Sequence, residues 1–195
     1  MTERLRHGFK AAAERIAVST RAEIGLTVHD RLDCSLLATH LGIPIISLRD
    51  LQHDGASLLS IDVLLEEEAR FSALTVSVGT RRLIIFNPAE PRGRSANSLA
   101  HELSHVLLEH PAAPALGSGG CRKWDGQLEG EADWLASTLL VPREGAIARM
   151  KAGATLEGGA QHFGVSLGLF RWRVNMTGTT KQVEALKQRG RVARG

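Results

Sequence analysis

Tyrosine is absent from the 195-residue sequence, cysteine occurs only twice, and there is no long apolar run. Because a membrane-spanning helix needs about 18 or more apolar residues in a row, the sequence predicts no transmembrane segment. The charged opening MTERLRHGFK leads directly into an amphipathic segment and lacks the apolar core of a secretory signal peptide. Two cysteines, Cys34 and Cys121, are too few for a disulfide framework. We therefore expect a soluble globular protein of the cytoplasm.

The positive charge of the chain is concentrated at its C-terminal end. The formal net charge is +3, but residues 179–195 contain five basic residues and a single acidic one. The rest of the chain is therefore close to neutral, which argues against strong contact with nucleic-acid phosphates. Residues 179–195 also lack apolar periodicity. We expect one domain over residues 1–178 and a basic, flexible tail over residues 179–195, with nucleic-acid binding secondary or absent.

Hydrophobic periodicity predicts an α+β fold. Apolar residues recur at helical spacing in the segments 3–23, 33–41, 95–110 and 127–140. Residues 72–86 alternate as in a hairpin with a turn at Gly79-Thr80, and a short edge strand is expected at 43–48. Two shorter helical segments, TLEGGAQHFGV and SLGLFRWRVNM, follow near the C-terminal end. The expected architecture is a small antiparallel sheet packed on a helical core, with a C-terminal helical hairpin.

The residues His101-Glu102-Leu103-Ser104-His105 form an HExxH motif. On a helix, residues four apart share a face, so both imidazoles can point toward one ion, and Glu102 lies about 100° away beside them. This arrangement is typical of zinc hydrolases in which the glutamate is the general base. The motif therefore predicts a zinc site with His101 and His105 as ligands and Glu102 as the catalytic base.

A catalytic zinc ion usually has three protein ligands and one open position, so a third ligand is needed. The extended motif HExxHxxGxxH is not present, because Leu108 and Pro111 stand where it requires glycine and histidine. His110 follows His105 by five residues and would lie about 140° off the ligand face of a continuous helix. The third ligand must therefore come from another part of the chain.

Acidic residues on the next predicted helix are the candidates. Glu129 and Asp133 are four residues apart and share one face, so Glu129 can bind the metal while Asp133 accepts a hydrogen bond from a ligand histidine. Glu131 lies about 200° from Glu129 around the same helix and is the alternative metal ligand. Only one of the two glutamates can be the ligand, and the pairing with Asp133 favours Glu129.

The segments HELSHVLLEHP and EGEADWLASTLLVP resemble the ImmA/IrrE family of metallo-endopeptidases, and the similarity covers most of the chain. The resemblance implies a zincin-like core of the gluzincin type that binds Zn²⁺, or alternatively Mn²⁺, through His101, His105 and Glu129. It also implies that Glu102 is the general base and that Asp133 orients a ligand histidine. The family cleaves helix-turn-helix repressors, so the implied partner is an XRE-type repressor. Release of stress-response or mobile-element genes would follow.

Other hypotheses also remain open from the sequence. The stretch AQHFGVSLGLF resembles a helix-turn-helix, with Arg171, Arg173 and Asn175 on its second helix. The alternative function is therefore a DNA-binding or repressor-binding regulator without proteolysis. If the chain is a peptidase, the absence of tyrosine excludes a phenol as the oxyanion-stabilising group and leaves His162, Arg171, Arg173 or a backbone N–H as candidates. Cys121, between the two metal-binding helices, could also reach the metal as a redox switch.

Overall fold

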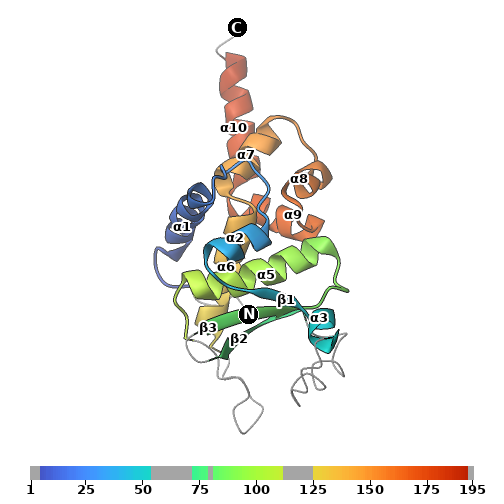
Figure 1. The fold of residues 1–195 in the computed structure, drawn as a ribbon. Coiled ribbons are helices and arrows are strands. Elements are labelled where there is room, and N and C mark those ends of the chain that lie inside the picture. Colours follow the sequence, from blue (N-terminus) through green and yellow to red (C-terminus); the bar gives the residue numbers. More distant parts are fainter. Residues whose placement is uncertain (1–4, 54–71, 79–80, 112–124, 193–195) are drawn as a thin grey trace.

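The computed structural model describes residues 5–53, 72–78, 81–111 and 125–192, and it has the expected α+β fold (Figure 1). The helices are α1 (Phe9–Glu23), α2 (Cys34–His40), α3 (Leu48–His53), α5 (Arg92–Leu107), α6 (Gly126–Leu140), α7 (Arg143–Lys151), α8 (Leu156–Phe163), α9 (Leu167–Met176) and α10 (Thr179–Val192). The strands are β1 (Ile45–Ser47), β2 (Ala73–Val78) and β3 (Arg81–Phe86). In this part of the chain, no helix combines the length and the apolar character needed to cross a membrane.

The three described strands form one sheet in the order β1-β3-β2. β2 and β3 pair antiparallel, with Thr75 opposite Ile84, as the hairpin pattern predicts. β1 pairs with β3 in parallel, so the sheet is mixed rather than entirely antiparallel. Strand direction was not predictable here because alternating side chains look the same in both orientations. The edge position of β1 suits Pro44, which has no N–H but whose carbonyl accepts a hydrogen bond from Ile84 N at 2.9 Å.

Helix α5 lies between the sheet and the other large helices, so its two sides are buried by different partners (Figure 1). It packs along α6 on one side and against β2 and β3 on the other. Leu99 and Leu103 of α5 and Leu135 and Leu139 of α6 are buried in the main core. Apolar spacing on both helices produces this packing, which brings the HExxH segment beside the start of α6.

Two buried arginines anchor the C-terminal end of α6. Arg173 donates to Val141 O at 3.0 Å and to Glu14 Oε1 at 2.6 Å, while Arg21 donates to the carbonyl oxygen of Leu139. Both guanidinium groups are fully buried. The last carbonyls of a helix lack partners within the helix and attract cations, so the two arginines satisfy and stabilise this end. They thereby fix the position of the helix whose first turns carry the acidic residues.

The C-terminal segment contains the expected helical hairpin. Helices α8 and α9 are joined through Gly164, which has the left-handed φ of 68°. Phe163 and Phe170 stack across the pair with ring centroids 6.0 Å apart, and both are buried. The two helices therefore pack on the body of the protein through their aromatic side chains.

Residues 179–195 were expected to form a basic, flexible tail, and most of this segment is helical in the structure. Thr179–Val192 is helix α10, which contacts α7 and α9. Thr179 and Val183 are buried, and Gln182 donates to Thr177 O at 3.0 Å. These tertiary contacts hold a helix that apolar periodicity alone did not reveal.

Candidate metal centre and active site

Helix α5 places the two histidines of the HExxH segment on one face. Their Nε2 atoms are 3.1 Å apart, and the rings are in edge contact with centroids 4.7 Å apart. Both side chains are largely buried between α5 and α6. The i, i+4 spacing of His101 and His105 therefore brings two imidazole nitrogens to a common point, as the motif predicts.

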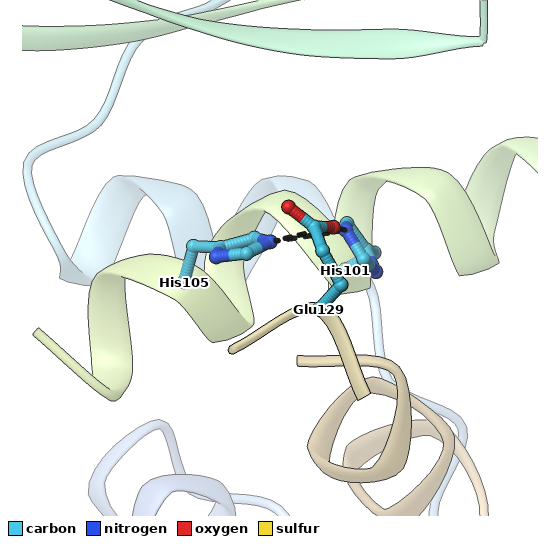
Figure 2. A group of neighbouring side chains, drawn as sticks. All are labelled: His101, His105 and Glu129. Carbon is cyan, nitrogen blue, oxygen red and sulfur yellow. Dashed lines mark hydrogen bonds and ion pairs between the residues drawn. The ribbon is translucent and has the colours of Figure 1, made fainter. Parts of the chain in front are cut away.

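Glu129, in the first turn of α6, meets the same point from the opposite side (Figure 2). Its Oε2 lies 3.2 Å from His101 Nε2 and 3.5 Å from His105 Nε2. The side chain of Asp125 begins α6 by accepting from Gln127 N and Leu128 N, which fixes the first turn. His101, His105 and Glu129 are the residues that the structure brings together as a possible metal site within the described segments.

Asp133 is one helical turn beyond Glu129 and contacts the other nitrogen of His101. The distance from His101 Nδ1 to Asp133 Oδ1 is 2.7 Å. Burial is the largest single influence on the pKa of His101 and lowers it, but the hydrogen bond and charge of Asp133, with the charges of Glu102 and Glu129, together raise the pKa above its ordinary value. Because a carboxylate only accepts, Nδ1 carries the proton and Nε2 presents a lone pair to Glu129 and His105.

The three donor atoms fit a zinc ion. Ligands bound at 2.0–2.2 Å to a tetrahedral zinc lie about 3.3–3.6 Å from one another. The observed separations of 3.1, 3.2 and 3.5 Å are close to this range. An imidazole lone pair and a carboxylate oxygen directed at one point repel each other unless a cation or a proton lies between them. The donor set of two imidazoles and one carboxylate therefore has the composition and the spacing of a zinc site with an open position.

Glu102 faces the sheet side of the cluster and is 4% exposed. Its Oε2 accepts from Thr75 N at 3.0 Å and from Thr75 Oγ1 at 2.5 Å. A residue of strand β2 thus holds the carboxylate that the HExxH motif assigns as the base. Thr75 was not identified from the sequence, because nothing in the strand pattern shows which threonine lies opposite the helix.

A comparison with known families identifies the family of the chain. The family of the IrrE N-terminal-like domain, peptidase M78, matches residues 38–175, which include α5 and α6. The chain belongs to the peptidase M78 family. The resemblance to the ImmA/IrrE metallo-endopeptidases is therefore confirmed. None of the curated proteins matches the chain.

Glu131, the alternative ligand, lies outside the three-residue cluster of this M78 chain. It is fully buried, and both of its carboxylate oxygens accept from Arg6, Oε1 from Nε at 2.6 Å and Oε2 from the terminal nitrogen at 2.5 Å. The pair raises the pKa of Arg6, mainly through its hydrogen bond to Glu131. Two residues beyond Glu129 on a helix, the Glu131 side chain points away from the cluster and toward the segment before α1.

His110 was excluded as a metal ligand from the sequence, and it lies outside the cluster. Its Nδ1 is nevertheless 2.9 Å from Nδ1 of His105. Burial lowers the pKa of His110, although the charge of Glu131 opposes this effect. A helical wheel could not reveal the contact, because α5 ends at Leu107 and the chain turns before His110.

The residues predicted as oxyanion-stabilising candidates or as a redox switch are not part of the metal cluster in the described segments. The buried Arg173 donates to Glu14, and His162 Nε2 lies 2.7 Å from His29 O. Both side chains therefore have their partners outside the metal cluster. Arg171 is exposed on α9. Cys121 lies outside the described residues.

Proposed function

We propose that this M78 protein is a zinc-dependent endopeptidase of the gluzincin type that cleaves an XRE-type helix-turn-helix repressor. Cleavage would release stress-response or mobile-element genes in the cytoplasm. The observation that carries the proposal is the separation of the donor atoms of His101, His105 and Glu129, which fits the ligand spacing of zinc. Mn²⁺ remains the alternative metal, because imidazole and carboxylate also bind it.

The chain's own residues supply the proton transfers of peptide hydrolysis. Zinc, when bound, acidifies water and polarises a carbonyl group. Glu102 accepts the proton of the attacking water and then donates it to the nitrogen of the leaving amine. Thr75 holds Oε2 of Glu102 with two hydrogen bonds, so the carboxylate is oriented before the substrate binds. Asp133 keeps the proton of His101 on Nδ1, which leaves Nε2 for the metal.

The edge of the sheet is a second argument for a polypeptide substrate. In the described part of the sheet, β2 has β3 as its strand neighbour on one side and is an edge strand. Thr75, on this strand, contacts Glu102, so the edge adjoins the reacting groups. An extended peptide can add to such an edge through main-chain hydrogen bonds. The specific choice of a repressor as substrate rests on the family alone.

A DNA-binding regulator is the rival function. Of the three polar residues on α9 that suggested it, Arg173 is buried and paired with Glu14, while Arg171 and Asn175 are exposed. The buried Phe163 and Phe170 attach this helical pair to the body of the protein. The packing therefore favours a structural role for α8 and α9.

Metal content tests the site. We expect the purified protein to hold about one zinc ion per chain. Glu129→Ala removes a ligand and should lose the ion. Glu131→Ala keeps all three ligands, because the Glu131 carboxylate faces Arg6, and should still hold one ion per chain at saturating zinc. Zinc content that is unchanged in Glu129→Ala would contradict the ligand assignment.

Cleavage of a co-expressed repressor tests the reaction. Glu102→Gln should keep the zinc ion and lose proteolysis of the co-expressed helix-turn-helix repressor, because the amide cannot accept the proton. Glu144→Gln, at an exposed position of α7, is the matched control and should cleave normally. Equal cleavage by Glu102→Gln and the wild type would exclude this mechanism, and salt-sensitive retention on DNA without cleavage would support the rival.

A further inference from the structure

The end of helix α5 folds back so that His110 contacts His105. Glu109 has a left-handed φ of 53°, which is uncommon for a residue other than glycine. His110 N donates to His105 O at 2.9 Å, and Glu109 N donates to Val106 O at 3.0 Å. These two bonds form a Schellman turn. The turn places the His110 side chain beside His105, the predicted metal ligand. On a continuous helix, His110 would lie about 140° away from His105 around the axis.

The contact between the two histidines permits two arrangements of protons. Their Nδ1 atoms are 2.9 Å apart, which is hydrogen-bond distance, so one atom donates and the other accepts. If His105 donates, its Nε2 carries a lone pair toward His101 and Glu129. If His110 donates, a neutral His105 carries its proton on Nε2, where it blocks metal binding. The direction of this hydrogen bond therefore decides whether His105 is ready to bind a metal.

Glu131 distinguishes the two arrangements. His110 is 5% exposed, and its Nε2 has Glu131 Oε2 3.9 Å away. Arg6 donates to both oxygens of Glu131, which favours an ionised carboxylate, and the remaining lone pairs of this acceptor can attract an N–H. The distance is longer than a direct hydrogen bond, but the attraction in a buried site favours a proton on His110 Nε2. With that proton in place, Nδ1 of neutral His110 is the acceptor.

We propose that His110 is a positioning residue that keeps the proton of His105 on Nδ1, with Glu131 and Arg6 setting the direction of the hydrogen bond. This inference rests on the proposed metal site. His101 is oriented directly by Asp133 at 2.7 Å, whereas His105 is oriented through His110. Acidic residues of α6 would thus orient both ligand imidazoles, one by direct contact and the other through an intervening histidine.

The tautomer of His105 can be measured on the unaltered protein. We expect long-range ¹H–¹⁵N correlation spectra of the metal-free full chain, recorded where the imidazoles are neutral, to show His105 protonated on Nδ1 and His110 protonated on Nε2. The opposite pair of tautomers would overturn the proposal. Glu131→Gln offers an amide that can donate to His110 Nε2, so the Nδ1–H form of His105 should become less populated. An unchanged population would overturn the role of Glu131.

Metal affinity then tests whether the contact matters for binding. His110→Leu removes both nitrogens, and the dissociation constant for Co²⁺ alone should rise about 10–100-fold. His110→Asn restores an acceptor oxygen near the position of Nδ1 and should recover most of that loss. Thermal unfolding of the metal-free variants controls for damage to the fold, and the Co²⁺ absorption spectrum reports the geometry of the ligands.

The outcomes separate this inference from the proposed function. If the wild type does not bind Co²⁺ or zinc, the metal site itself is wrong. If the wild type binds and folded His110→Leu and His110→Asn bind with the same affinity as each other, the positioning role of His110 is refuted while the metal site stands. Co²⁺ affinity in His110→Leu equal to that of the wild type would also refute the positioning role of His110.

Discussion

Two adjacent glycines of α8 offer a sharp test of how the C-terminal hairpin is packed. A Cβ atom added at Gly159 would lie 2.3 Å from Cε1 and Cζ of Phe170, whereas one added at Gly158 would meet only Thr155 Oγ1, at 3.5 Å. The Phe170 ring is fully buried and stacked on Phe163, so it has little room to move aside. The two substitutions should therefore change the stability of the protein in different ways.

The magnitude follows from two opposing effects. Replacing a helical glycine by alanine stabilises by about 0.5–1 kcal/mol, because the unfolded chain loses conformational freedom. Gly158→Ala should show this gain. Gly159→Ala has the same intrinsic gain, but forcing a methyl group into the packed ring costs about 1–3 kcal/mol. The difference between the two variants is thus about 1–3 kcal/mol, which corresponds to a difference in Tm of about 2–12 °C for a domain of this size.

Thermal and urea unfolding followed by circular dichroism measure this difference. Both variants must be compared in the same metal-free state, because a bound metal adds its own stabilisation. Equal unfolding temperatures for Gly158→Ala and Gly159→Ala would refute the close contact between α8 and Phe170. It would also reopen the possibility that α8 and α9 are a separate helix-turn-helix.

Two further predictions concern the site. Thr75→Val keeps a β-branched side chain but removes the hydroxyl that donates to Glu102 at 2.5 Å. The kcat for repressor cleavage should therefore fall about tenfold or more, while the zinc content stays unchanged. A normal kcat would show that Thr75 does not orient the base. The raised pKa of His101 means that a proton competes with the metal at higher pH than in free imidazole, so zinc affinity should fall as the pH decreases through that pKa. Asp133→Asn removes an influence that raises this pKa and should move the fall to lower pH in isothermal titrations, and an unshifted profile would contradict the contribution of Asp133.

Some features of the site were predictable because they depend on local geometry. The helical period alone places His101 and His105 on one face, and it separates Glu129 from Glu131 on the next helix. The structure shows both relations, with Glu129 in the cluster and Glu131 on Arg6. The hairpin of β2 and β3 was predictable for the same reason, since alternation is a local pattern.

Other features depend on contacts between distant segments. Arg6 and Glu131 are 125 positions apart, and no pattern in either segment indicates the pair. Helix α10 was not predicted from apolar periodicity, and it contacts α7 and α9 in the tertiary structure. The parallel direction of β1 could not be read from alternation. The contact of His110 with His105 could not be predicted, because a helical wheel assumes that the helix continues, whereas α5 ends at Leu107 and Glu109 adopts a left-handed conformation.

By itself, the sequence of this M78 chain determined the kinds of donor atoms and their order along two helices, because residue identity and helical period are local properties. The tertiary structure decided which groups contact the predicted ligands and the predicted base: Thr75 on Glu102, Asp133 on His101 and His110 on His105. These contacts depend on how α5 packs against α6 and the sheet. Such packing is a property of the whole core, so no single segment of the sequence contains it.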